Sequence, residues 1–194
     1  MSLAPWRSLL AHALYRNRSL PNARYLQLAT IGLDGRPRNR TVVFRGFLAS
    51  TDQLQIVTDS RSQKVLEINH QPWGEVCWYF PKTREQFRLA GQLTLVSHQT
   101  TDPILQSARF LAWQQLSDLA RIQFAWPTPK HPLNTEKEAF QPPLPDKDQP
   151  LIHFCLLLLD PLEVDHLELR GEPQNRCLYS LDHRQNWVCE MVNP

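Results

Sequence analysis

The chain has 194 residues, enough to bury roughly 70% of the surface that the unfolded chain would expose, and we expect one domain over residues 1–194. The formal net charge is +2 without a block of cations, which argues against a nucleic-acid-binding protein. The longest apolar run, residues 154–159, is far shorter than the ~20 residues that cross a bilayer. With no signal-peptide pattern at the start, we expect a soluble cytoplasmic protein without membrane contact.

Neither the cysteines nor the histidines are spaced as metal ligands, and we expect no metal site. The cysteines stand mostly in apolar, strand-like surroundings, which predicts buried free thiols in a reducing compartment. Also absent are a P-loop, a GxGxxG turn and a GxSxG elbow, so side chains and a helix end must hold any phosphate. The four cysteines are Cys77, Cys155, Cys177 and Cys189.

Apolar spacing predicts the elements of the first half. Trp6, Leu9, Leu10, Ala13 and Leu14 recur every three or four residues, which predicts an amphipathic helix. Asp34-Gly35 favours a tight hairpin between two strands. A short helix over 60–69 should be capped by Asp59 or Ser60, with Val65, Leu66 and Ile68 inward. The strands expected here cover residues 24–32, 38–48, 53–58, 75–80 and 86–97.

The second half begins with a helix and ends in strands. Asp102 and Pro103 suit the cap and first turn of a helix over 104–115. Seven prolines between residues 126 and 150 predict an extended surface loop, and a loop of this length inside a compact domain usually has a function. The leucine run 156–159 predicts a strand buried on both faces. The expected strands are 151–159, 164–169, 176–181 and 187–192, giving about eight in all and a barrel with helices around it.

Cationic and hydroxyl side chains gather in the block from Val57 to Lys64. A phosphate monoester carries nearly two charges and needs several converging donors. Arg61 and Lys64 lie three apart at the start of the expected helix, hence on one face of it, and the free backbone N–H groups there add attraction. Thr58 and Ser62 add hydroxyls, and Arg40 a further cation. The alternative is that Arg61 and Lys64 only solvate a surface helix.

Arg40 and Arg45 bracket a strand-like segment, Thr41, Val42, Val43 and Phe44. Five residues apart in an unbroken strand, the two arginines would face opposite sides and hold separate tasks, one at a phosphate and one near a ring or substrate. The backbone between them can meet the edge of a planar ring, and Gln86 can hydrogen-bond the same ring. Ordinary edge-strand and surface roles remain open for these residues. Of the tryptophans, Trp73, Trp78, Trp113 and Trp126 suit stacking but are more often core residues.

Together the blocks 40–45, 57–64 and 84–91 point to the phosphate and ring of flavin mononucleotide (FMN). With TVVFRGF, TDSRS, WYFPKTREQFRLAG and the closing VNP, they resemble the pyridoxamine 5'-phosphate oxidase family, and most closely a cyanobacterial-type branch of it. The resemblance implies a mainly β, α+β fold, a six-stranded antiparallel Greek-key split barrel with flanking helices. It also implies a homodimer with FMN in a cleft made by both subunits. The expected cofactor residues are Arg40, Thr41, Val42, Val43, Arg45, Val57, Thr58, Arg61, Ser62, Lys64 and Gln86.

The resemblance also shows departures from the oxidases. Of the C-terminal motif that surrounds substrate and flavin there, only Arg176 remains, with Leu178 and Ser180 in place of a histidine and an arginine. Arg45 stands where the oxidases have a lysine. No residue presents itself as a required acid or base. We therefore expect an FMN-dependent oxidoreductase, with two alternatives: a genuine pyridoxamine/pyridoxine 5'-phosphate oxidase, or a flavin-binding module without turnover. Candidate substrate residues are Arg45, Arg121 and Arg176.

Overall fold

The computed structural model describes residues 3–194. Its helical elements are α1 (Pro5–Asn17), α2 (Gln63–His70), α3 (Pro103–Gln114), α4 (Asp118–Arg121) and the short 3-10 turns η1 (Ile122–Ala125) and η2 (Lys137–Phe140). Its strands are β1 (Tyr25–Ile31), β2 (Pro37–Val43), β3 (Gly46–Phe47), β4 (Leu54–Asp59), β5 (Trp73–Phe80), β6 (Glu85–Val96), β7 (Phe154–Glu168), β8 (Asn175–Leu181) and β9 (Trp187–Val192).

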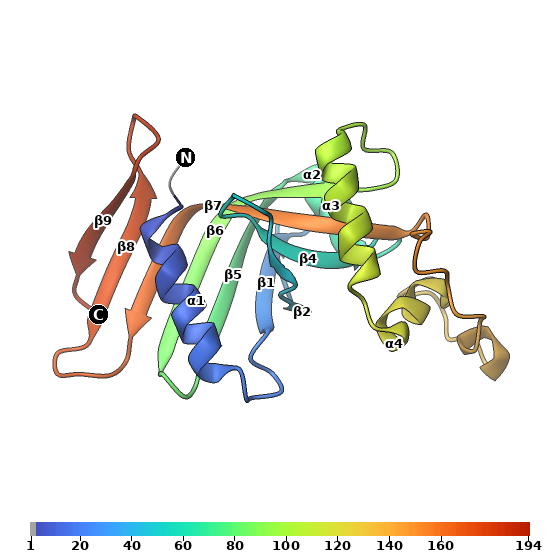
Figure 1. Cartoon of the computed structure of the whole chain (residues 1–194), viewed down its shortest axis with the longest axis horizontal. Coiled ribbons are helices and arrows are strands. Elements are labelled where there is room, and N and C mark those ends of the chain that lie inside the picture. The colour runs from blue at the N-terminus through green and yellow to red at the C-terminus, as the bar shows by residue number, and fades with distance from the viewer. Residues whose placement is uncertain (1–2) are drawn as a thin grey trace.

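The strands form one antiparallel sheet that curls into a half-barrel (Figure 1). The order along the sheet is β2-β1-β5-β6-β7-β4-β3, and β8 pairs with β7 and with β9. Six of these strands, from β2 to β4 in that order, form the main path, which β3 and the β8–β9 hairpin extend. The predicted antiparallel split-barrel class is confirmed, and the described sheet has nine strands.

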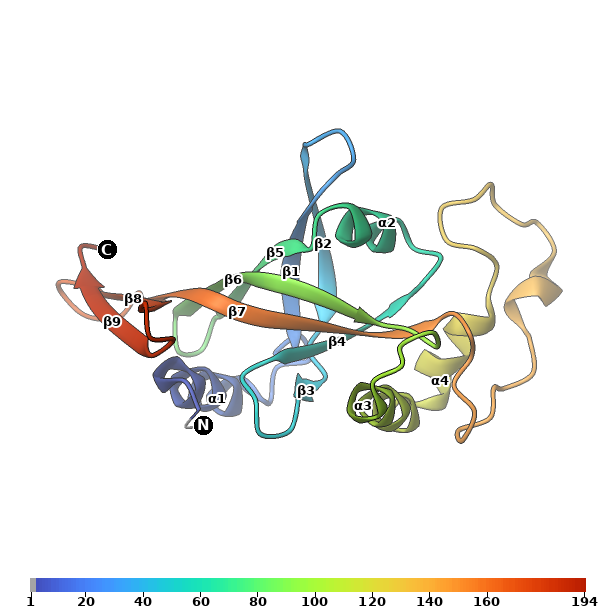
Figure 2. The same cartoon turned by 90° about the horizontal axis from the view of Figure 1, so that it is seen from above.

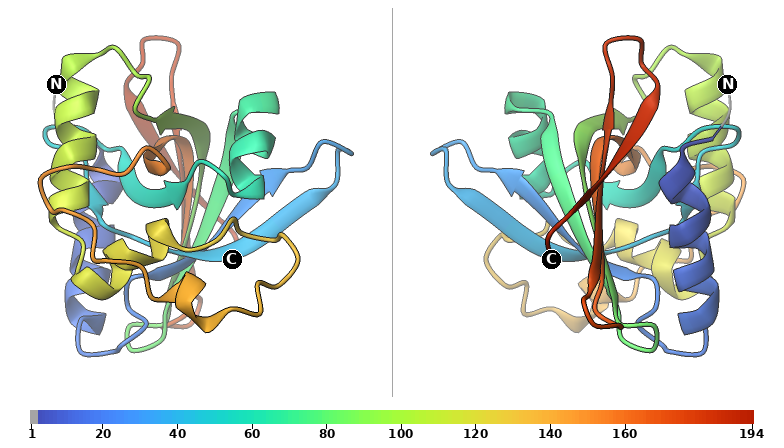
Figure 3. Two further views of the ribbon diagram at one scale, coloured as in Figure 1. Left: turned by 90° about the vertical axis from the view of Figure 1, so that its right-hand side faces the viewer. Right: turned by 90° about the vertical axis from the view of Figure 1, so that its left-hand side faces the viewer.

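Helices cover both faces of the sheet. α1 and α3 lie on one side of it, and α2 lies on the other beside β1 (Figure 2). The β1–β2 hairpin projects from the body of the molecule (Figure 3), and its turn contains Gly35 at φ +74°, as the Asp34-Gly35 pair predicted. The β8–β9 hairpin and the loop after α4 lie at opposite ends of the molecule (Figure 1).

β7 is one strand where two were expected. Its first part, Phe154 to Leu159, pairs with β4, and its second part, Glu163 to Glu168, pairs with β8. Pro161 lies between the stretch that pairs with β4 and the stretch that pairs with β8, and it is paired only with β6. Its missing N–H therefore removes no ladder hydrogen bond on the edge of β7 that β4 and β8 share. A register shift in β6 between Ala90 and Gly91 absorbs the irregularity at this point. The predicted break at Asp160-Pro161 was therefore wrong.

The leucine run of β7 contributes to two cores, as predicted for a strand buried on both faces. Leu157 and Leu159 belong to the barrel core, which contains Trp78 and Phe87. Leu156 and Leu158 belong to a second cluster beneath α3 that contains Trp113 and Phe154. Alternation of side chains along the strand assigns neighbouring leucines to opposite faces. The strand thus joins the barrel to the helical region.

The predicted helices are confirmed with one set of corrections. The Asp102 carboxylate accepts hydrogen bonds from the backbone N–H groups of Ile104 and Leu105, as expected of a cap. α2 begins later than predicted: Ser62 is its N-cap residue and makes no side-chain cap bond. Leu66, expected inward, is 59% exposed, whereas Val65 and Ile68 are buried. None of the helices within residues 3–194 is long and apolar enough to cross a membrane.

The prediction of four free thiols was half wrong. Cys177 on β8 and Cys189 on β9 form a disulfide, with their Cα atoms 6.2 Å apart. The two strands are adjacent, with Tyr179 opposite Cys189, so the cysteines meet diagonally across the hairpin. Cys77 and Cys155 are free, and burial raises the pKa of the Cys155 thiol to about 11. Sequence spacing alone could not show the cross-strand pair.

Gly91 provides a test of the β6–β7 irregularity. A Cβ atom at Gly91 would lie 1.9 Å from the Asp160 carbonyl oxygen, so Gly91→Ala must push the two backbones apart. We expect Gly91→Ala to lower the free energy of unfolding by about 3 kcal/mol. Gly35→Ala is the matched control, because its Cβ meets nothing within 4 Å and only the positive φ is strained; it should cost about 1 kcal/mol. Urea denaturation measures both, and equal losses would contradict the close approach.

Candidate functional site

A cavity of about 590 Å³ opens between the sheet and the proline-rich loop. One wall consists of residues from β2, β4 and the start of α2, and the opposite wall consists of α4, η1 and the loop after it. Eight of the eleven predicted cofactor residues line this cavity: Arg40, Thr41, Val42, Val43, Arg45, Val57, Thr58 and Lys64. Segments far apart in the sequence are thus brought to one place.

Lys64, Thr58 and Ser62 form a compact donor cluster on the sheet side of the cavity. The Lys64 ammonium donates to Thr58 Oγ1 and to Ser62 Oγ, each at 3.1 Å. The two hydroxyl oxygens lie 3.2 Å apart. Both hydroxyl residues are buried, with Thr58 4% and Ser62 9% exposed. We call these three residues the Lys64 cluster.

The Lys64 ammonium has no anionic partner among residues 3–194. None of the ion pairs in this part of the chain includes Lys64, and its hydrogen bonds go only to hydroxyls. Burial and, second, the nearby charge of Arg40 lower the pKa of Lys64, and Asp59 and Glu67 only partly offset them. A half-buried cation without a counter-ion is unfavourable, so the site is electrostatically prepared for an anion.

Arg40 has a different status, because it already has a carboxylate. Its Nη2 lies 2.5 Å from Glu67 Oε2, and Glu67 is 1% exposed. Thr30 Oγ1 donates to the same carboxylate oxygen at 2.6 Å and also accepts from Arg40 Nη1. Arg40 therefore lines the cavity as half of a buried ion pair, while Lys64 supplies the uncompensated charge.

Arg45 lies in the same cavity as Arg40, which corrects the expectation of opposite faces. That expectation assumed an unbroken strand, but β2 ends at Val43 and Arg45 belongs to the connection to β3. Arg45 Nε is buried without a hydrogen-bond partner in the described chain. Burial and the charge of Arg24 lower the Arg45 pKa. The two arginines still differ in role, since Arg45 has no carboxylate partner within residues 3–194.

Arg61 and Ser62 precede α2 and are not on its face, so the expected pairing of Arg61 with Lys64 on one helix face was wrong. The Arg61 guanidinium hydrogen-bonds the Asp59 carboxylate and two loop carbonyls, and Arg61 does not line the cavity. Asp59 does line it.

Gln86 and Arg176 lie away from this cavity. Gln86 is half-buried on β6, opposite Leu167 of β7, and Leu167 is opposite Arg176 of β8. Directly opposed residues share a face of the sheet, so Gln86 and Arg176 stand in one row. Arg176 is held by Asp165 at 2.7 Å. This row belongs to the end of the sheet that carries the β8–β9 hairpin.

Arg121, the remaining candidate for substrate binding, is 3% exposed on α4. It donates to the Leu116 carbonyl oxygen at 2.8 Å and pairs with Asp118 at 3.0 Å. Its guanidinium also lies over the Trp113 ring, 5.7 Å from the centroid. Arg121 thus packs behind the cavity wall and does not line it.

Several cavity residues were not expected from the sequence. Apart from Asp59 at the end of β4, the polar ones come from η1 and the proline-rich loop, where no periodic pattern marks them, and only the length of that loop indicated a function. Trp78 and Trp113 are fully buried core residues, whereas Trp126 lines the cavity. The polar additions are Asp59, Gln123, Thr128, Lys130, His131 and Asn134.

The structure also gathers three possible metal ligands that sequence spacing did not indicate. Atoms of Glu85, His166 and Glu168 lie within 4.8 Å of one another. His166 Nε2 is 3.0 Å from Glu85 Oε2, and its ring stacks on Phe87 with a 4.0 Å centroid distance. Burial alone would raise the Glu85 pKa, but hydrogen bonds from His166 and Thr83 lower it overall. The His166–Glu85 hydrogen bond and the stacked ring hold this group together through contacts within the protein.

Comparison with known proteins identifies the family. Residues 3–97 match the family model described as "Pyridoxamine 5'-phosphate oxidase, FMN-binding domain". The chain is also 42% identical over 196 residues to an Arabidopsis thaliana protein named pyridoxine/pyridoxamine 5'-phosphate oxidase 2, covering 99% of this chain and 98% of the relative. The chain belongs to the pyridoxamine 5'-phosphate oxidase family of FMN-binding proteins.

Solved structures agree with this family. A Nostoc punctiforme protein described as pyridoxamine 5'-phosphate oxidase-related and FMN-binding is 61% identical and covers the whole of both chains, with a TM-score of 0.97. PhzG from Burkholderia lata has a TM-score of 0.77 at 20% identity, covering 100% of this chain and 98% of its own, and shows the shared fold. FMN is therefore the cofactor of this family member.

The residues present fit FMN. Its phosphate needs several donors and at least one cation, and the Lys64 cluster has two hydroxyls and an ammonium that lacks a counter-ion. Its planar ring needs an adjoining space with apolar walls, which Val42, Val43 and Val57 help to form. The chemistry of the donor set thus agrees with the family assignment.

Lys64→Met tests the Lys64 cluster. Loss of a charge-assisted contact worth about 1.5 to 3 kcal/mol should weaken FMN binding more than tenfold. In the natural protein, FMN affinity should fall as pH rises through the lowered Lys64 pKa, below the range of an ordinary lysine. Stability of the FMN-free protein has the opposite sign and rises there, because the unfolded chain holds the proton more tightly. Fluorescence titration from pH 7 to 10 measures affinity, and the alkaline loss should vanish in Lys64→Met.

Arg40→Met serves as a comparison, because it removes a cavity cation that already has a carboxylate. It leaves Glu67 buried without its cation and should lower stability, measured by urea denaturation, as well as affinity. Unchanged FMN affinity in Lys64→Met would remove Lys64 from the phosphate site.

Proposed function

We propose that this chain is an FMN-dependent oxidoreductase related to pyridoxamine 5'-phosphate oxidase, with the FMN phosphate on the Lys64 cluster. The observation that carries the proposal is the half-buried Lys64 ammonium, which lines the cavity and whose partners within residues 3–194 are hydroxyls. Bound phosphate supplies the missing anion and raises the lysine pKa again. Membership of an FMN-binding family and a cavity of sufficient size support the same conclusion.

The protein's own groups bind, orient and enclose the cofactor. FMN supplies the redox chemistry, since its ring accepts and returns a hydride. The backbone from Thr41 to Val43 would offer N–H and C=O groups to the edge of the bound ring, and Arg45 would place a positive charge in the same cavity. The loop wall limits the access of water to the ring. Because the flavin carries out the redox step, the reaction does not require a catalytic acid or base from the protein.

We propose further that the site is completed by a second copy of the chain. Gln86 and Arg176, which the family resemblance assigns to FMN and substrate, share one row on the sheet but do not line the cavity. The hairpin that carries Arg176 lies at the far end of the molecule from the loop wall (Figure 1). A two-fold dimer in which this row faces the partner's cavity brings both sets together.

Vitamin B6 phosphate oxidation is the second candidate. The relative named pyridoxine/pyridoxamine 5'-phosphate oxidase 2 matches nearly the whole chain, which favours it. Against it, Arg121 is buried behind the wall and Arg176 already binds Asp165. A substrate phosphate would have to compete for Arg176 or use the unpaired Arg45. We therefore propose the broader oxidoreductase function first.

Spectroscopy and a substrate assay decide among these functions. Purified protein should be yellow, and added FMN should raise the melting temperature of the cofactor-free form. Oxygen consumption with pyridoxamine 5'-phosphate would establish the second candidate. Reduction of the bound flavin by NADPH, without turnover of that substrate, would favour the broader function. A colourless protein whose melting temperature does not change when FMN is added would contradict all flavin-based functions, including a flavin-binding module without turnover.

Complementation tests the shared site. Lys64→Met removes the phosphate cation of one half, and Gln86→Leu removes the expected ring contact of the other. If each site takes one half from each subunit, a heterodimer of the two variants contains one intact site. The heterodimer, isolated from co-expressed variants that carry two different affinity tags, should bind about one FMN tightly per two chains, whereas each variant alone binds weakly. A 22.6 kDa monomer by light scattering that retains FMN would contradict this arrangement.

A further inference from the structure

We infer that Arg61 is a positioning residue that ties the start of the proline-rich loop to the turn between β4 and α2, and so holds the wall of the flavin cavity. This rests on the proposed function, which places the flavin in that cavity. The loop starts at Trp126, directly after η1, and supplies cavity-lining residues through Asn134. Arg61 stands in the segment that also contains Thr58, Ser62 and Lys64.

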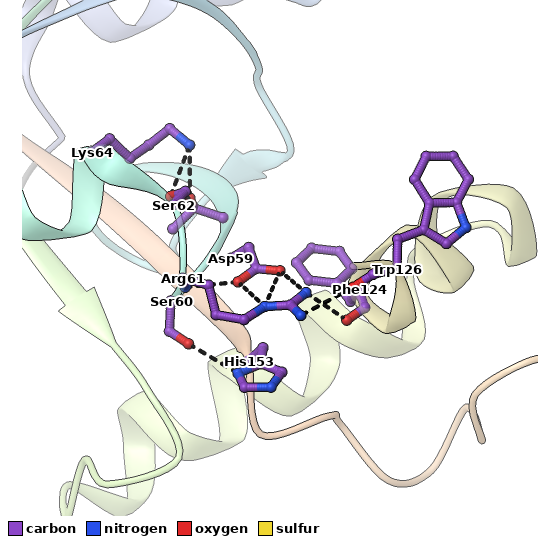
Figure 4. A network of polar contacts seen from close by, with 9 residues as sticks. Asp59, Ser60, Arg61, Ser62, Lys64, Phe124, Trp126 and His153 are labelled. Carbon is purple, nitrogen blue, oxygen red and sulfur yellow. Dashed lines mark hydrogen bonds and ion pairs between the residues drawn. The ribbon is translucent and has the colours of Figure 1, made fainter. Parts of the chain in front are cut away.

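The contacts of Arg61 run in two directions (Figure 4). Toward its own turn, Nε and Nη2 donate to the Asp59 carboxylate at 3.0 and 2.6 Å, and its backbone N–H donates to Asp59 Oδ1 at 2.7 Å. Toward the loop, Nη1 donates to the Trp126 carbonyl oxygen at 3.0 Å and Nη2 to that of Phe124 at 3.1 Å. The guanidinium therefore bridges residues more than sixty positions apart in the sequence.

These contacts leave little capacity for a phosphate. A guanidinium has five N–H donors, and the four hydrogen bonds of its head group to Asp59, Phe124 and Trp126 engage all but one. Its charge is compensated by Asp59, unlike that of Lys64. Asp59 lines the cavity, whereas Arg61 does not. Arg61, which the resemblance suggested as a phosphate ligand, thus holds the loop that forms the cavity wall.

The loop needs this tie because its composition deprives it of donors. Pro127, Pro129 and Pro132 have no backbone N–H, so the segment cannot build a backbone ladder of its own. The carbonyl groups at the end of η1 need a partner and favour a positive one. Arg61 supplies hydrogen-bond donors and a positive charge to these carbonyl groups. A hydrogen bond from the Lys130 ammonium to the side chain of Gln63 is a second contact between the loop and the start of α2.

A charge-neutral double variant, Asp59→Asn with Arg61→Gln, separates a positioning role from a phosphate contact. Arg61→Gln alone would leave an unpaired carboxylate on the cavity wall, which would repel the FMN phosphate for a different reason. The double variant removes the tie and leaves the net charge unchanged. Affinities for FMN and for riboflavin, which lacks the phosphate, are compared with those of the natural chain and of Lys64→Met.

We expect the double variant to weaken FMN and riboflavin by the same factor, about tenfold, so that the ratio of their affinities is preserved. Lys64→Met should instead lose the preference for FMN. Amide hydrogen exchange of residues 122–136, measured without flavin, should increase in the double variant while α3 stays protected, a local effect that general destabilisation would not produce.

A loss of the FMN preference in the double variant, like that in Lys64→Met, would make Arg61 a phosphate ligand and overturn the inference. Unchanged affinity for both flavins with unchanged exchange would also overturn it. If the natural protein binds neither flavin, the proposed function fails. The hydrogen-exchange comparison then decides by itself whether Arg61 holds the loop.

Discussion

The pairing of β7 with three other strands is the constraint on which the architecture depends. β6 follows it along its length, while β4 and β8 share its other edge in succession. Its alternating leucines close the barrel core on one face and the cluster beneath α3 on the other. This strand also separates the two functional regions, with the cavity near its first half and the Arg176 row near its second. One protomer therefore carries both groups of residues, which the proposed dimer would bring together.

The cationic residues at and near the cavity differ in whether a carboxylate pairs with them. Arg40 is neutralised by the buried Glu67, and Arg61 by Asp59, so both act chiefly within the protein. Within residues 3–194, Lys64 has hydroxyls as its partners and Arg45 has no carboxylate, and burial lowers the pKa of both. Because a partly buried charge without a counter-ion is unfavourable, these two cations identify where an anionic ligand is most strongly stabilised.

Local chemistry explains which elements could be predicted. The Asp102 cap and the Gly35 turn depend on a few neighbouring residues, and both were expected correctly. Pro161 does not break β7, because it lies between the stretch that pairs with β4 and the stretch that pairs with β8. That position depends on the arrangement of the whole sheet, which the local sequence does not show. The Cys177–Cys189 bond likewise depends on which strands are adjacent. The loop side of the cavity escaped prediction because its residues follow no period.

By itself the sequence determined the family, the cofactor, the antiparallel split-barrel class and the segments that form the sheet side of the cavity. Motifs and periodicity depend on residues close together in the sequence, so they can be recognised without a three-dimensional structure. Only the tertiary structure decided which of the cavity's cations have a carboxylate partner. Asp59 and Arg61 are neighbours in sequence, but Arg61 meets the loop carbonyls only after folding. Glu67 reaches Arg40 by the packing of α2 on the sheet. Ion pairing depends on distances of a few ångströms, which the order of residues does not specify.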